Sequence, residues 1–124
     1  MNKPTKSYQE LEVWQKAHQL VMEVYLITKD FPKIETFGLT SQIRRAVVSI
    51  PANIVEGYKR LGKADKIRFY NIAQSSLEEV KYYLFLSDEL GLIKEYPQIK
   101  NMAEEVSKML DGYIKSIQKV TVSK

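Results

Sequence analysis

The segment from residue 38 to residue 61 constrains the fold most strongly, because apolar residues recur through it every three or four positions. This spacing is typical of an amphipathic α-helix. The stripe comprises Leu39, Ile43, Ala46, Ile50, Ile54, Gly57 and Leu61. Pro51 lies inside the pattern, where proline removes the hydrogen bond to the carbonyl of Val47. The stripe keeps its phase across Pro51, so one kinked helix is favoured over the alternative of two helices.

Glycine and proline divide the rest of the chain into three further segments with helical periodicity, at about residues 8–30, 64–90 and 97–120. The first should end at Phe31-Pro32, because the residue before proline disfavours the α region. Gly91 is a typical C-terminal cap, and Pro97 suits the first turn of a helix. Each segment has a row of predicted core positions. In the first segment these are Trp14, Ala17, Val21, Val24 and Thr28, flanked by Leu20, Ile27 and Phe31. In the segment at 64–90 they are Phe69, Ala73, Leu77, Val80 and Leu84, and in the last segment Ile99, Met102, Val106, Met109, Tyr113, Ile117 and Val120.

The four helical segments are similar in length and joined by short connections, which favours an antiparallel up-down-up-down four-helix bundle. A chain of 124 residues fits one domain, so residues 1–124 are expected to form a single all-α bundle. Residues 1–7 and 121–124 are expected to be frayed tails.

The third helical segment carries apolar residues on a second face, formed by Ile72, Tyr83, Leu86 and Leu90. One four-helix core needs only one apolar face from each helix. A surplus apolar face is usually an interface, so the sequence predicts a homo-oligomer.

Composition argues against most catalytic chemistry. The chain has no cysteine and a single histidine, His18, preceded three positions earlier by Gln15 rather than glutamate, so the Glu-x-x-His pairs of di-iron bundles are absent. The stretch between Gly57 and Gly62 lacks the phosphate-binding loop pattern. We therefore expect no catalytic residue, no metal and no cofactor. No apolar run is long enough to span a membrane, and the cysteine-free composition favours a cytoplasmic location.

Positive charge is concentrated in one part of the chain. Residues 42–68 hold seven basic and two acidic side chains, a balance of +5, whereas the remainder holds 12 basic and 13 acidic groups. The seven basic residues are Arg44, Arg45, Lys59, Arg60, Lys63, Lys66 and Arg68. One interpretation is a surface that neutralises RNA or DNA phosphates; the alternative is a solvated, basic end of the bundle.

A polar row accompanies the apolar stripe of the second helix. Its members, besides Arg45 and Arg60, are Gln42, Ser49, Asn53 and Glu56. The row is interpreted either as an ordinary solvated face or as a polar seam that meets another subunit or a ligand. Ser49 and Asn53 flank Pro51, and their side chains are candidates for satisfying the backbone groups that proline frees.

Three stretches resemble a known family: LEVWQKAHQLVMEVY, FPKIETFGLTSQIRRAVVSIPANIVEGYKR and RFYNIAQSSLEEVKYYLFLSDELG. They are similar to the small bacterial proteins encoded in intervening sequences of 23S rRNA genes, also called S23 ribosomal protein or four helix bundle protein. The match runs from Tyr8 to about Gly91, and its most specific part is SIPANIVEG. The resemblance implies a four-helix bundle that assembles as a homopentameric ring, with no catalytic residue. More distantly, the chain resembles the basic pentameric accessory proteins of diversity-generating retroelements, which associate with a reverse transcriptase and nucleic acid.

The sequence therefore predicts a non-enzymatic, oligomeric bundle that contacts RNA or DNA through residues 44–68. The alternative is a protein–protein scaffold or accessory subunit with no direct contact to nucleic acid.

Overall fold

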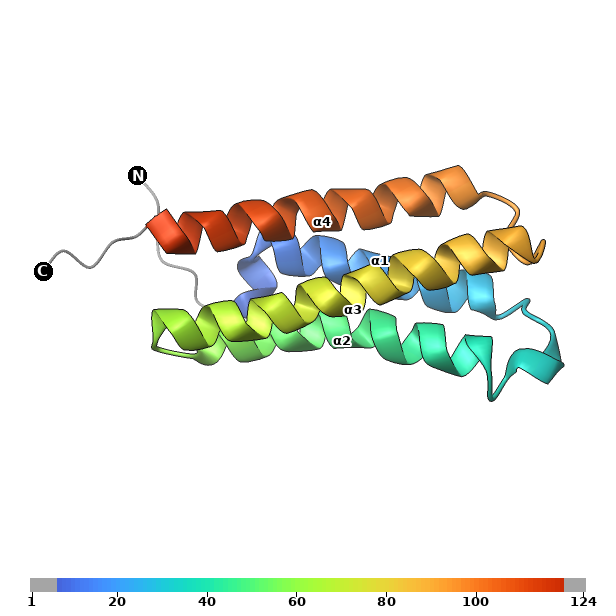
Figure 1. Cartoon of the computed structure of the whole chain (residues 1–124), viewed down its shortest axis with the longest axis horizontal. Helices are drawn as coiled ribbons and strands as arrows, with labels where there is room; N and C mark the ends of the chain where they lie inside the picture. The colour runs from blue at the N-terminus through green and yellow to red at the C-terminus, as the bar shows by residue number, and fades with distance from the viewer. Residues whose placement is uncertain (1–6, 120–124) are drawn as a thin grey trace, which may run out of the picture.

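The computed structural model describes residues 7–119 and contains four long helices. They are α1 (Glu12–Thr28), α2 (Leu39–Lys59), α3 (Lys63–Glu89) and α4 (Tyr96–Lys119), and the one-turn 3-10 helices η1 (Tyr8–Glu10) and η2 (Lys33–Glu35) flank α1. The four long helices run alternately up and down along a common long axis (Figure 1). Residues 7–119 contain no β-strand. The predicted all-α, antiparallel four-helix bundle is confirmed.

The first helix is shorter than the predicted range of 8–30. Leu11 adopts an extended conformation, with φ −75° and ψ 124°, and separates η1 from α1. The Ser7 hydroxyl accepts a hydrogen bond from the backbone N–H of Gln9 at 3.2 Å, which stabilises η1 as a separate turn. At the other end, α1 stops at Thr28, and the chain passes through the buried Phe31 into η2.

Helix α2 is continuous through Pro51, with helical residues on both sides. This confirms the interpretation of one helix rather than two. The amide nitrogen of Asn53 donates to the carbonyl of Ser49 at 2.8 Å and to its hydroxyl at 3.0 Å. Asn53 therefore supports the backbone beside the proline, at Ser49 rather than at Val47, whose carbonyl loses its usual partner to Pro51.

The core lies between the four helices, and its deepest residues differ from the predicted ones at several places. In α1, Val13 and Leu20 are more buried than Trp14 and Val21. In α4 the buried row is Ile99, Ala103, Val106, Leu110 and Ile114, with the predicted Met102, Met109, Tyr113 and Ile117 only partly buried. Leu61 is fully exposed because it follows the end of α2. Val120 lies outside the described residues.

Helices α2 and α3 approach each other closely at Gly57. A Cβ atom at this position would lie 2.5 Å from a ring carbon of Tyr70, which is fully buried. Burial, and then the neighbouring Tyr113, raise the pKa of the Tyr70 phenol above its ordinary value. The contact fixes the end of α2 against the start of α3, and so positions the basic turn between them.

Candidate functional site

The two arginines at the start of the basic segment are far from the other five residues along α2. Arg44 donates from Nε to the hydroxyl of Thr28 at 2.8 Å, and its guanidinium lies 4.6 Å from the ring centroid of Tyr25. Arg44 therefore ties α2 to α1. Arg45 is exposed on the outer surface of α2. These two residues do not form one surface with the basic groups at the α2–α3 turn.

Lys66 serves the backbone of α2. Its ammonium group donates to the carbonyl of Gly57 at 3.1 Å and to that of Tyr58 at 2.8 Å. The last carbonyls of a helix lack intrahelical partners, so Lys66 acts as a C-terminal cap reaching over from α3. Desolvation by burial lowers the pKa of Lys66. The ammonium group of Lys66 therefore stabilises the end of α2.

Arg60 and Arg68 share one aromatic ring and one carboxylate. Each guanidinium lies 4.5 Å from the ring centroid of Phe69. Arg60 pairs with Glu56 at 3.0 Å and with Asp65 at 3.9 Å, and Arg68 pairs with Asp65 at 3.2 Å. Phe69, a predicted core residue, is only partly buried. The two acidic residues of the basic segment thus lie beside its arginines.

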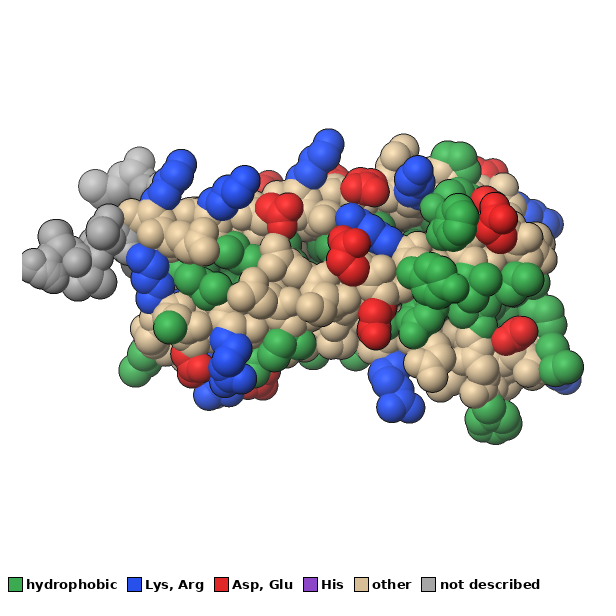
Figure 2. Space-filling view, viewed as in Figure 1, with side chains coloured by type: hydrophobic (Ala, Val, Ile, Leu, Met, Phe, Trp, Pro, Cys, Tyr) green, Lys and Arg blue, Asp and Glu red, His purple; other side chains and the backbone are tan. Residues whose placement is uncertain are grey.

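The remaining cations of the turn meet the end of α4. Lys63 donates from Nζ to the carbonyl of Gln118 at 3.0 Å, which joins the start of α3 to the last turn of α4. Lys59 is exposed at the end of α2, and Lys115 and Lys119 are exposed on α4. We call Lys59, Lys63, Lys115 and Lys119 the basic end. Lysine and arginine side chains lie over the turn and along α4 at this end of the molecule (Figure 2). Sequence reasoning missed Lys115 and Lys119, because only the fold brings α4 back to the α2–α3 turn.

The polar row of α2 divides between the inside and the outside of the bundle. The Ser49 hydroxyl is 2.7 Å from that of Ser76 on α3, and Asn53 bonds to Ser49. Gln42 and Glu56 are exposed. The middle of the row therefore forms a seam between α2 and α3 of the same chain.

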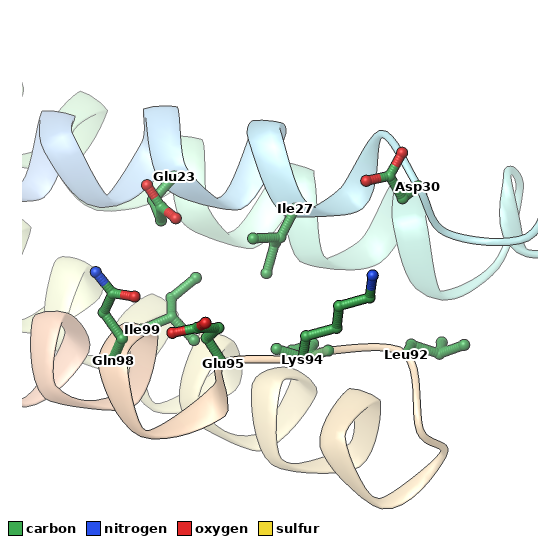
Figure 3. A pocket seen from close by; sticks show the side chains of 9 residues that line it. Glu23, Ile27, Asp30, Leu92, Lys94, Glu95, Gln98 and Ile99 are labelled. Carbon is green, nitrogen blue, oxygen red and sulfur yellow. The ribbon is translucent and has the colours of Figure 1, made fainter.

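The opposite end of the bundle contains a cavity of about 200 Å³. It is lined by Glu23, Ile27, Asp30, Leu92, Ile93, Lys94, Glu95, Gln98 and Ile99. The lining side chains of α1 face those of the α3–α4 loop and the start of α4, and Lys94 points across toward α1 (Figure 3). The cavity contains none of the predicted site residues. None of its nine lining residues is a histidine, serine or cysteine.

The single histidine stacks on a tryptophan. The rings of His18 and Trp14 are nearly parallel, with centroids 5.1 Å apart, and Tyr8 meets Trp14 edge-on. His18 is exposed. Within residues 7–119, no group of three or more His, Cys, Asp or Glu side chains is arranged to hold a metal ion. No helix among these residues is long and apolar enough to cross a membrane.

The fold and this surface define a small all-α protein with a basic end. Its sequence matches the model of the 23S rRNA-intervening sequence protein family over residues 9–112. The chain belongs to this family, which confirms the resemblance seen in the sequence.

A solved structure supports the same assignment. The chain is similar to a crystal structure of a protein with unknown function from the S23 ribosomal protein family of Bacteroides thetaiotaomicron. The TM-score is 0.77 at 30% sequence identity, and the similarity covers 83% of this chain and 98% of that one. No functionally curated protein is significantly similar in sequence.

Proposed function

We propose that the protein is a non-enzymatic homo-oligomer that binds RNA or DNA phosphates through its basic end. The observation that carries the proposal is the convergence of Lys59 and Lys63 with Lys115 and Lys119, where the Lys63 ammonium meets the Gln118 carbonyl at 3.0 Å. Lysines on three helices at one end of a bundle form a compact positive surface. Such a surface binds polyanions by releasing their counterions, without reading base sequence.

The structure changes which residues we assign to this surface. Arg44 and Lys66 bond to the protein itself, and Arg60 and Arg68 lie beside acidic partners. Arg45 lies about four turns away on α2. The proposed phosphate contacts are the four lysines of the basic end, because they lie at one end of the bundle on three helices. Lys63, whose ammonium also donates to the Gln118 carbonyl, and Lys59 are the two that belong to the basic segment of the sequence.

Oligomerisation would make a modest surface effective. Several copies of a weak site on one particle bind a polyanion by avidity, because the second contact is intramolecular. We expect a pentamer, the assembly that the family resemblance implies. The association of the family with 23S rRNA genes is consistent with a cytoplasmic location and with RNA as the ligand.

The test is fluorescence anisotropy with labelled single-stranded and duplex RNA and DNA at low and physiological salt. One variant has Lys59, Lys63, Lys115 and Lys119 changed to glutamine. Its control has Lys29, Lys33, Lys94 and Lys100, which are exposed elsewhere, changed to glutamine, so the two variants carry the same net charge.

We expect the first variant to lose binding and the control to keep most of it. On duplex DNA, the slope of log affinity against log salt should fall by roughly 0.9 for each phosphate that the variant no longer neutralises. Equal losses in both variants, or no binding by the natural protein at low salt, would refute the proposal and favour a protein–protein scaffold.

A further inference from the structure

An apolar groove runs along the outer surface between α1 and α2. It has a volume of about 240 Å³ and is lined by Tyr8, Trp14, His18, Val21, Val48, Pro51, Ala52 and Val55. No lysine, arginine, aspartate or glutamate lines it. The methyl groups of Val48 and Ala52 lie on the outward side of α2, and Val48 is 42% exposed. We call this surface the α1–α2 groove. It leaves apolar area in water that a packed partner would cover.

A second, partly apolar surface lies on α3. Ile72, Ser75, Glu79 and Tyr82 follow one another at helical spacing along its exposed side. Ile72 is 39% exposed and Tyr82 58% exposed. We call these four residues the α3 ridge. Because the groove and the ridge belong to different helices, a contact between them would join two different surfaces of the protein.

The charges beside the two surfaces are complementary and lie at matching positions along the bundle axis, which we call their heights. Arg45 flanks the α1–α2 groove one turn beyond Ser49, and Glu79 lies about one turn beyond Ser76 in the same direction along the bundle. Because the hydroxyls of Ser49 and Ser76 are 2.7 Å apart, Arg45 and Glu79 should lie at similar positions along the bundle axis. Within residues 7–119, neither Arg45 nor Glu79 forms an ion pair.

A second pair of charges agrees with this register. Glu56 is adjacent to Gly57, and Arg68 is two residues from Tyr70, which packs against Gly57. Glu56 and Arg68 therefore also share a height, near the α2–α3 turn. Glu56 and Arg68 also pair with Arg60 and Asp65 within the chain, and they flank the two surfaces in the order that would match if both bundles pointed the same way.

We propose that the α3 ridge of a second copy of this chain packs into the α1–α2 groove, with the two bundles parallel and Arg45 facing Glu79 of the neighbour. The inference rests on the homo-oligomer part of the proposed function and names its contact surfaces. A contact between different surfaces is heterologous, and it closes into a ring when its rotation allows. Parallel packing places every basic end on the same rim, where one polyanion can reach several copies.

The experiment is a charge reversal followed by light scattering across a dilution series. Arg45→Glu places two carboxylates together at each contact, and Glu79→Arg places two guanidinium groups together. Each single variant should raise the concentration of half-assembly by about tenfold or more. The double variant, Arg45→Glu with Glu79→Arg, restores opposite charges and should assemble much like the natural chain.

Lys108→Glu is the matched control, because Lys108 is an exposed cation on α4 away from both surfaces. It should assemble normally, and circular dichroism should show that all variants fold. An oligomer unaffected by both single reversals, or not rescued in the double variant, would overturn the proposed surfaces while leaving oligomerisation intact. A natural chain that stays at 14.4 kDa at micromolar concentration would overturn both, and would leave the groove to a different protein.

Discussion

The two sides of α2 invert the usual relation between polarity and position. On the side facing α3, the hydroxyls of Ser49 and Ser76 meet at 2.7 Å and Asn53 bonds to Ser49, so polar groups hold the bundle together. On the outer side, Val48 and Ala52 expose methyl groups next to the α1–α2 groove. The polarity of a side chain therefore does not by itself identify a surface that is available for a partner. Such a surface is identified by side chains that are neither packed nor hydrogen-bonded within the folded chain.

The inner side of α2 should be the more sensitive to mutation, and Gly57→Ala tests this most severely. The new methyl group would lie 2.5 Å from the ring of the buried Tyr70, so the helices must separate or the ring must move. We expect a loss of about 1–3 kcal/mol in unfolding free energy, since overpacking outweighs the better helix propensity of alanine. Urea denaturation measures the loss.

Gly112→Ala is the matched control for that substitution. Gly112 also lies within a helix, α4, but a Cβ atom there meets nothing within 4 Å. The same change should therefore stabilise the protein by about 0.5–1 kcal/mol. If both variants were stabilised, the close approach of α2 to α3 at Gly57 would be wrong.

The hydroxyl pair between α2 and α3 should make a smaller contribution. Ser49→Ala and Ser76→Ala should each cost about 1 kcal/mol, because each removes a hydrogen bond and leaves a partly buried partner. A double-mutant cycle should give a coupling of about 0.5–1 kcal/mol, since the two hydroxyls contact each other. Urea unfolding of the four proteins supplies the cycle.

Val48→Ser sharpens the contrast, because it adds a hydroxyl on the outer side of the same helix. Measured below the concentration of assembly, it should change stability by no more than about 0.5 kcal/mol. A cost equal to that of Ser49→Ala would mean that Val48 is packed within its own chain, and the two sides of α2 would not differ as described.

The last effect concerns pH, and it is absent at neutral pH. Tyr70 has a raised pKa in the folded protein, so above about pH 10 the unfolded chain loses this proton while the folded chain keeps it. The unfolded state then binds fewer protons, and stability falls as pH rises. Tyr70→Phe removes this dependence, so the variant should gain on the natural protein between about pH 9 and pH 11.

Urea unfolding across this pH range measures the difference between the two proteins. Lys66, whose pKa is lowered, contributes a slope of opposite sign, but it is present in both proteins and cancels. Parallel stability curves would show that Tyr70 ionises equally well in the folded chain, and is therefore less buried than the packing against Gly57 implies.

The sequence predicted the bundle well because helical periodicity and glycine and proline signals are local. It located all four helices, and the stripe of α2 predicted Ile43, Ile50 and Ile54, which are fully buried. It misplaced the start of α1, since the extended conformation of Leu11 leaves no mark on the apolar period. In α4 the prediction missed the buried Leu110 and Ile114, because the depth of a residue depends on where the neighbouring helices lie.

The candidate site was only partly predictable, for the same reason. Charge counting found the basic turn, but it could not show that Lys66 caps α2 or that Arg44 bonds to Thr28. Lys115 and Lys119 are some fifty residues from the turn in sequence and join it only through the fold. The division of the α2 polar row between a seam and a surface likewise depended on Ser76 of another helix.

The outer side of α2 is proposed to meet α3 of a neighbouring copy, and cysteine cross-linking tests this contact most directly. The natural chain has no cysteine, so introduced thiols report without background. Ala52→Cys and Ser75→Cys place exposed thiols on the groove and the ridge at similar heights. Disulfides form only where Cα atoms approach within about 7 Å. After mild oxidation, we expect the double-cysteine chain to give a ladder of covalent species longer than two chains, while neither single-cysteine chain is linked. A product confined to one chain, or a covalent dimer from either single-cysteine chain, would contradict the proposed contact.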